Sequence, residues 1–141
     1  METIELIEFE AKSKHEIPLF SVSVSAGVPV PAESDVDELI DLNEYLIANP
    51  TSTFFARING DSYKHLGIAD QDLLIADSEV SLRDGNTVLV SLNKELTVKI
   101  YRDIKGEKYF QSEDNRFVPV NMKPHLDYQI VGVITKVIHS F

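Results

Sequence analysis

Short segments in which β-branched and aromatic residues predominate follow one another through the chain after residue 52. Such segments, separated by turn-forming residues, are typical of strands in a small sheet. We expect strands at 53–58, 72–77, 86–92, 95–101, 107–112 and 128–138. Turn-forming residues between them, including Asn93-Lys94 and Lys105-Gly106, predict chain reversals. Many strands at close intervals predict a mostly β fold, either a small β-sandwich or a partly open barrel.

Helical spacing of hydrophobic residues stands out in one place, where Val36, Leu39, Leu46 and their neighbours recur at helical intervals. Ser34-Asp35 provides a helix start and Asn49-Pro50 a stop. We therefore expect one short helix from Asp35 to Ala48. Residues 1–19 show little patterning and read as an extended N-terminal arm.

Residues 20–31, FSVSVSAGVPVP, join two unlike patterns. Alternation from Phe20 to Val24 predicts an extended segment. Ala26-Gly27 then supplies two very small residues, and the prolines that follow prevent regular sheet pairing. The pattern therefore predicts an extended segment followed by a peptide bond, between Ala26 and Gly27, that has almost no side chain on either side.

Charge is distributed unevenly over the 141 residues, whose net charge is -10. Residues 1–52 carry eleven acidic and two basic residues, whereas the remainder is nearly balanced. Nucleic-acid-binding proteins show a basic surface instead, so we expect no direct nucleic-acid binding. The acidic third is either a solvated surface or a docking site for a partner.

The composition also limits the compartment and the chemistry. The sequence has no run of about 18 apolar residues, and an acidic start unlike that of a secretory signal. We expect a cytoplasmic protein with no membrane contact. The absence of cysteine excludes thiolate chemistry, and the four histidines are too scattered for a zinc site. No cofactor and no metal site are expected.

Two stretches contain candidate catalytic residues. Asn59-Gly60-Asp61-Ser62 follows a predicted strand and would present the Ser62 hydroxyl at a turn, although most such serines only bond locally. In 95–101, strand alternation puts Thr97 and Lys99 on one face. A strand lysine usually points to solvent, but a desolvated lysine becomes able to take a proton from a serine hydroxyl. His65 is a rival base.

In ordered pieces from Pro18 to the C-terminus, the chain resembles the LexA-like family of self-cleaving serine peptidases. The pieces are IPLFSVSVSAGVPVPA, IDLNEYLIANPTSTFFARINGDS, GIADQDLLIADS, DGNTVLVSLNKELTVKIY and YQIVGVITKVI. The resemblance implies a Ser-Lys dyad of Ser62 and Lys99 that cuts the bond between Ala26 and Gly27. It implies Val24 as a substrate-strand residue, backbone amides of Asp61 and Ser62 as the oxyanion hole, and Thr97 as the residue that orients the lysine. Tyr63 departs from the family, where methionine often follows the nucleophile.

The resemblance divides the chain into a removable arm (1–26), a linker with a short helix (27–52) and a β-rich catalytic domain (53–141). Only twenty-six residues, acidic and without a two-helix pattern, precede the bond, which favours the UmuD type over LexA-type repressors. It also implies a homodimer, self-cleavage stimulated by a RecA-type nucleoprotein filament in the SOS response, and partnership with a UmuC-type DNA polymerase in translesion synthesis. The alternatives are a non-catalytic interaction module on the same scaffold and a LexA-like repressor fragment without its DNA-binding domain.

Overall fold

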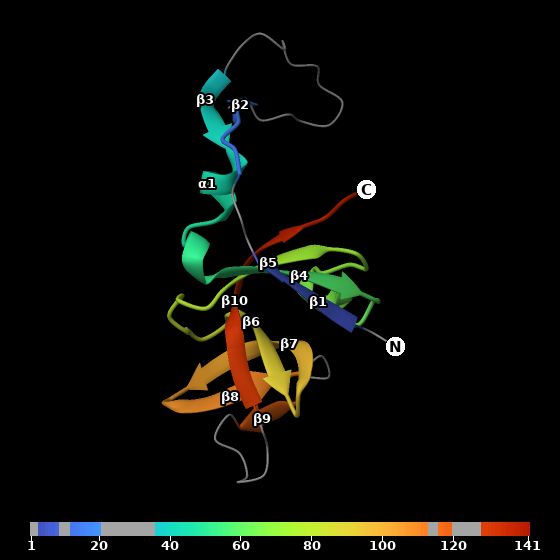
Figure 1. The fold of residues 1–141 in the computed structure, drawn as a ribbon. Coiled ribbons are helices and arrows are strands. Elements are labelled where there is room, and N and C mark those ends of the chain that lie inside the picture. Colours follow the sequence, from blue (N-terminus) through green and yellow to red (C-terminus); the bar gives the residue numbers. More distant parts are fainter. Residues whose placement is uncertain (1–2, 9–11, 21–35, 113–115, 120–127) are drawn as a thin grey trace, which may run out of the picture. The chain divides into compact units, whose positions relative to one another are not determined.

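The computed structural model describes residues 3–8, 12–20, 36–112, 116–119 and 128–141. The chain divides into two compact units, one formed by residues 1–9 with 49–141 and the other by residues 10–48 (Figure 1). An eight-stranded antiparallel sheet builds the first unit, and a two-stranded antiparallel sheet builds the second. The prediction of a mostly β fold is confirmed.

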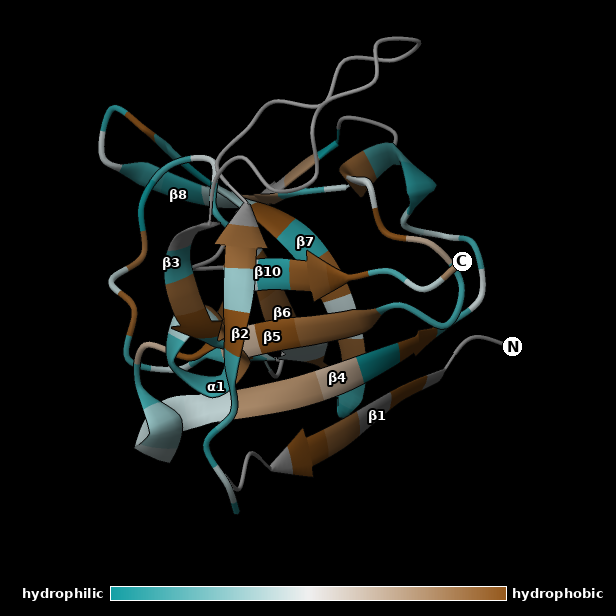
Figure 2. Cartoon of the chain, turned by 90° about the horizontal axis from the view of Figure 1, so that it is seen from above, coloured by the Kyte–Doolittle hydropathy of each residue, from teal (hydrophilic) through white to brown (hydrophobic). Residues whose placement is uncertain are grey.

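The larger sheet has the strand order β1-β4-β5-β10-β6-β7-β8-β9. Its strands are β1 (Thr3–Glu8), β4 (Thr53–Asn59), β5 (Leu73–Asp77), β6 (Thr87–Leu92), β7 (Glu95–Ile104), β8 (Glu107–Gln111), β9 (Phe117–Pro119) and β10 (Tyr128–Ile138). The six strands predicted after residue 52 are all present, with ends shifted by three residues or fewer. Hydrophobic residues run along β4, β5 and β6 (Figure 2), as expected of strands in the interior of a sheet.

Two tight hairpins fix the register around β7. Asn93 and Lys94 between β6 and β7, and Lys105 and Gly106 between β7 and β8, all have positive φ. Two successive positive-φ residues form the type I′ turn, whose twist matches that of paired strands. Both predicted reversals are therefore confirmed, and they align β7 with its two neighbours residue by residue.

Strand β10 bends the sheet between its two halves. Residues 128–133 pair with β6 and residues 133–138 pair with β5, with an irregularity in each ladder (Figure 1). Such bulges increase local twist. At Gly132 an added Cβ would lie 3.0 Å from the backbone of Asp77, so the bend depends on a residue without a side chain.

The bent sheet buries side chains on both of its faces. One hydrophobic cluster contains Ala56, Leu74, Leu89 and Val98, and the other contains Val88, Val90, Tyr101, Phe110 and Val133. Ile4 of β1 packs against the first cluster, to which β7 contributes Val98. The sheet thus curls until β1 approaches β7, while β1 and β9 remain its two ends. This agrees with a partly open barrel.

The predicted helix from Asp35 to Ala48 is wrong in its first half. Strand β3 (Val36–Asp41) occupies that part and pairs with β2 (Glu16–Phe20), and the helix α1 is limited to Leu42–Leu46. Pairing with β2 satisfies the backbone of this segment in extended form, a choice that its short hydrophobic pattern does not determine. Helix α1 begins after Asp41, whose side chain accepts a 3.2 Å hydrogen bond from the Asn43 amide.

Sequence reasoning missed four strands. The residues of β1 and β2 show weak patterning, those of β3 have a hydrophobic spacing that predicted a helix, and β9 has only three residues. Two short 3-10 turns, η1 (Pro50–Ser52) and η2 (Lys64–Leu66), complete the described elements. No helix within the described ranges has the length and apolar character needed to cross a bilayer.

Candidate functional site

Ser62 lies in a turn that begins where β4 ends. Gly60 has φ 115°, a conformation that favours glycine, and its amide donates a 2.7 Å hydrogen bond to the Asp70 carboxylate. The hydrogen bond from the Gly60 amide is the main reason why the pKa of Asp70 is below its usual value, and a hydrogen bond from the Gln71 side chain is the second. The turn therefore has a defined backbone path before it reaches Ser62, whose side chain is exposed.

The residues after Ser62 anchor the turn to the core. The carbonyl of Tyr63 accepts hydrogen bonds from the amides of Leu66 (2.9 Å) and Ile68 (3.2 Å). The side chains of Tyr63 and Leu66 pack against the first hydrophobic cluster, in which Ile68 is 1% exposed. The exposed Ser62 is thus followed directly by residues that pack against the core.

Lys99 lies in the middle of β7, between the two type I′ hairpins. It is directly opposite Val88 of β6, and it shares its face with Thr97 and with buried Tyr101. Lys99 is half-buried. It is therefore more buried than is usual for a lysine in a strand, but it is not fully removed from water. Its Nζ donates a 3.3 Å hydrogen bond to Oγ of Ser112, just beyond the end of β8.

The serine turn and the lysine strand meet through Tyr63 and Thr97. The Tyr63 hydroxyl lies 3.1 Å from Oγ1 of Thr97, across 34 residues of sequence. The residue that follows Ser62 is therefore in contact with the residue two positions before Lys99. The contact also gives the tyrosine that departs from the family pattern a definite role in local packing. The orientation of Lys99 by Thr97 and the approach of Ser62 to Lys99 remain predictions.

The other predicted site residues are less informative. Val24, Ala26 and Gly27 lie outside the described residues. Asp61 is exposed, and its carboxylate lies 3.8 Å from Nζ of Lys64. His65, the rival base, is exposed within η2. The oxyanion role of the Asp61 and Ser62 amides remains a prediction.

Two acidic residues outside the predicted site, Asp72 and Asp77, are buried. Asp72 is 1% exposed, and it accepts a hydrogen bond from the Ala69 amide (2.8 Å) and lies 2.6 Å from Nδ1 of His139. Burial raises the pKa of Asp77, but hydrogen bonds from Ser52, the Glu79 amide and Asn49 together lower it below its usual value. Both carboxylates are therefore bonded to other groups of the fold. The described residues contain no cluster of three potential metal ligands.

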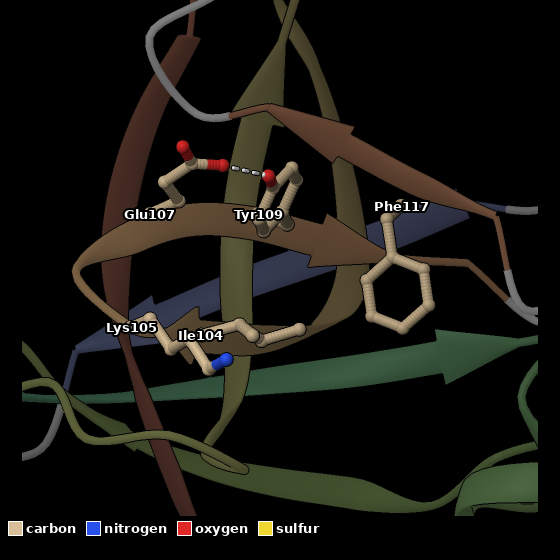
Figure 3. A pocket seen from close by; sticks show the side chains of 5 residues that line it. All are labelled: Ile104, Lys105, Glu107, Tyr109 and Phe117. Atoms are coloured by element: carbon tan, nitrogen blue, oxygen red, sulfur yellow. Dashed lines mark hydrogen bonds between the residues drawn. The ribbon is translucent and has the colours of Figure 1, made fainter.

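A separate pocket of about 480 Å³ lies at the other end of the β7–β8 hairpin. Ile104, Lys105, Glu107, Tyr109 and Phe117 line it, and the Tyr109 hydroxyl donates to the Glu107 carboxylate (Figure 3). That hydrogen bond raises the pKa of Tyr109. These lining residues are aromatic, charged and aliphatic and include no serine, so they offer no nucleophile of the kind predicted here.

Sequence reasoning missed Ser112, although the sequence contains the information needed to find it. A two-residue turn at Lys105-Gly106 pairs Ile104 with Glu107, and counting back along both strands reaches Lys99 opposite Ser112. The Tyr63–Thr97 contact has no comparable local signal. It depends on how the turn after β4 packs on β7.

Comparisons with known proteins show the family to which the chain belongs. The family model described as Peptidase S24-like matches residues 18–135. Protein SamA of Salmonella typhimurium is 35% identical over 127 residues, which cover 87% of this chain and 85% of that protein. Protein ImpA of Escherichia coli is 32% identical over 128 residues, covering 86% and 83% of the two chains. The LexA repressor of Glaesserella parasuis is 30% identical over 137 residues, covering 96% of this chain and 65% of the repressor. The chain therefore belongs to the Peptidase S24-like family, as its resemblance to the LexA-like self-cleaving peptidases predicted.

Proposed function

We propose that this chain is a serine peptidase that cleaves itself between Ala26 and Gly27, with Ser62 as nucleophile and Lys99 as general base. Membership of a peptidase family supports the reaction class. The Tyr63–Thr97 contact of 3.1 Å supports the assignment of residues most strongly, because it links the Ser62 turn to the face of β7 that carries Lys99.

Strand β7 offers a place for an extended substrate. Strand β6 pairs with Glu95–Ile100, whereas β8 pairs only with Ile100–Ile104. On the side away from β6, no described strand pairs with Glu95–Lys99. Peptidases commonly bind their substrates by adding them as a strand. The alternating segment that leads to Val24 suits such an addition, and the small residues at 26 and 27 leave room for the serine to reach the carbonyl.

The reaction proceeds in two steps. Neutral Lys99 takes the Ser62 hydroxyl proton as Oγ attacks the Ala26 carbonyl carbon, and the amides of Asp61 and Ser62 stabilise the oxyanion, typically by ~3–4 kcal/mol. Breakdown of this intermediate passes the proton to the Gly27 amine and leaves residue 26 as an ester on Ser62. Water, deprotonated by Lys99, then hydrolyses the ester to give residues 1–26 and 27–141. Because substrate and enzyme share one chain, the effective concentration is high.

The biological role follows from the type of relative. Proteins SamA, ImpA and MucA match 87%, 86% and 68% of the chain, respectively. We propose that the chain acts in SOS mutagenesis, in the cytoplasm, where a RecA-type filament on single-stranded DNA stimulates cleavage. The trimmed homodimer then serves a UmuC-type polymerase in translesion synthesis.

Alkaline self-cleavage tests the enzymatic proposal. The wild-type chain, Ser62→Ala, Lys99→Ala and His65→Ala are incubated separately at rising pH, and products are identified by intact mass. We expect the wild-type and His65→Ala chains to split after residue 26 and the other two to remain whole. Equal cleavage of wild type and Ser62→Ala would identify a contaminating protease and favour a non-catalytic interaction module. Cleavage that survives in Lys99→Ala but is lost in His65→Ala would make His65 the base.

A further inference from the structure

A base in a dyad needs a third group to aim it, because a lysine side chain has four rotatable bonds and a strongly hydrated ammonium. The resemblance gave this role to Thr97. In the structure the Thr97 hydroxyl lies 3.1 Å from the Tyr63 hydroxyl, whereas the Lys99 amine contacts a different hydroxyl, that of Ser112. The two hydroxyl groups thus have separate partners.

We propose that Ser112 is the positioning residue for the Lys99 amine. This inference rests on the proposed function, since it concerns the base of the same reaction. Ser112 Oγ accepts a 3.3 Å hydrogen bond from Lys99 Nζ, and both side chains are half-buried. Thr97 then acts on the serine side of the site, where it holds the turn through Tyr63.

The position of Ser112 is set by two independent constraints. The Lys105-Gly106 turn fixes the register of β7 and β8, with Ile100 opposite Gln111 and hence Lys99 opposite Ser112. Just past the end of β8, the Ser112 amide donates a 2.9 Å hydrogen bond to the carbonyl of Arg116, the residue before β9. The hydroxyl is therefore presented to Lys99 by a backbone held on both sides of it.

The surroundings of the amine determine how its contact can be measured. Strand β6 presents the apolar residues Val88, Val90 and Leu92 to this face. The titratable or charged residues that the described elements present to it are Glu95, Tyr101 and Asp103 of β7, Lys108 of β8, Tyr128 of β10 and Tyr63 of the turn. The Ser112 hydroxyl itself does not titrate in the usual range. A change in the pH profile after its removal therefore reports on the amine and not on a lost charge.

The test compares Ser112→Thr with Ser112→Val, which have the same shape and differ in the hydroxyl. We expect the valine variant to lower the plateau rate of alkaline self-cleavage about 10- to 100-fold, the scale of a small misplacement of a reacting group. Loss of an acceptor from the ammonium also favours the neutral amine, so the midpoint of the pH–rate profile should move to lower pH. The threonine variant should restore both. Ser91→Ala is the matched control, because Ser91 is a half-buried strand serine on the opposite face.

A second readout does not need cleavage. In the Ser62→Ala background, which is expected to keep the chain whole, NMR relaxation of the Lys99 side chain measures whether its amine is held. We expect a lower order parameter with Ser112→Val and no change with Ser112→Thr or Ser91→Ala. Thr and Val variants that agree in plateau rate, midpoint and order parameter would overturn the inference. Cleavage by Ser62→Ala would overturn the proposed function instead, while the relaxation data would still decide the contact.

Discussion

The two compact units achieve their structure in different ways. In the unit of residues 1–9 and 49–141, large hydrophobic side chains such as Leu74, Leu89 and Phe110 are buried at 2% exposure or less. In the unit of residues 10–48, Leu39 is 56% exposed and Tyr45 is 61% exposed. The first unit is stabilised mainly by removal of apolar surface from water. Among its described residues the second buries one hydrophobic side chain, that of Ile47, and it depends more on backbone pairing and surface contacts.

The ion pairs of the smaller unit each contribute little to its stability. Lys14 forms exposed ion pairs with Glu44 (3.3 Å) and Glu16 (3.7 Å), and the first of these is the main reason why the pKa of Lys14 is raised. Exposed pairs of this kind are worth little in water.

The largest effect on stability is expected when a side chain is removed from the core of the larger unit, and this substitution tests whether burial stabilises that unit. Leu89→Ala deletes a side chain with 0% exposure and should lower the free energy of unfolding by about 2–5 kcal/mol. Urea denaturation followed by circular dichroism measures the change, with the Ser62→Ala chain as background so that cleavage does not interfere. A loss below about 1 kcal/mol would mean that burial is not what holds this unit.

A smaller effect is expected at Asp77, where polar contacts operate inside the larger unit. Asp77→Asn weakens hydrogen bonds from Ser52 (2.6 Å) and Asn49 (2.7 Å) and should cost about 1–2 kcal/mol at neutral pH. Because folding lowers the pKa of this carboxyl, its contribution is present above the unfolded-state value of ~3.9 and is lost as pH falls through the lower folded value. Unfolding free energies of both chains at pH 7 and below pH 4 should therefore converge at acidic pH. A difference that stays constant would contradict the prediction.

The smallest effect is expected in the unit of residues 10–48. Leu39→Ala removes a residue of the same type as Leu89, yet it should change the unfolding free energy by less than about 0.5 kcal/mol, because its side chain is already mostly in water. The same denaturation experiment makes the pair directly comparable. A loss as large as that of Leu89→Ala would show that Leu39 is covered in solution and that the two units are less different than their exposures indicate.

The parts of the fold that could be predicted are those that depend on the pattern of a few neighbouring residues. Alternation and turn residues identified β4 to β8 and β10, since a period of two and a type I′ turn are properties of a few consecutive residues. The segment 36–41 was misassigned because its pattern is compatible with helix and strand, and pairing with β2 decided between them. Likewise, residue type alone could not show that Asp72 and Asp77 are buried, because burial of a carboxylate depends on partners such as His139 and Ser52, which are distant in sequence.

At the site, the sequence by itself determined the candidate chemical groups, a serine after a strand-ending glycine turn and a lysine in a strand, and even the register that sets Lys99 opposite Ser112. Only the tertiary structure decided which hydroxyl each group contacts. It brings the Tyr63 hydroxyl into contact with that of Thr97, 34 residues away in sequence, and places the Lys99 amine within hydrogen-bond distance of Ser112. The reason is physical: strand register follows from local turn geometry, whereas the approach of a turn to a distant strand depends on the packing of the whole curled sheet.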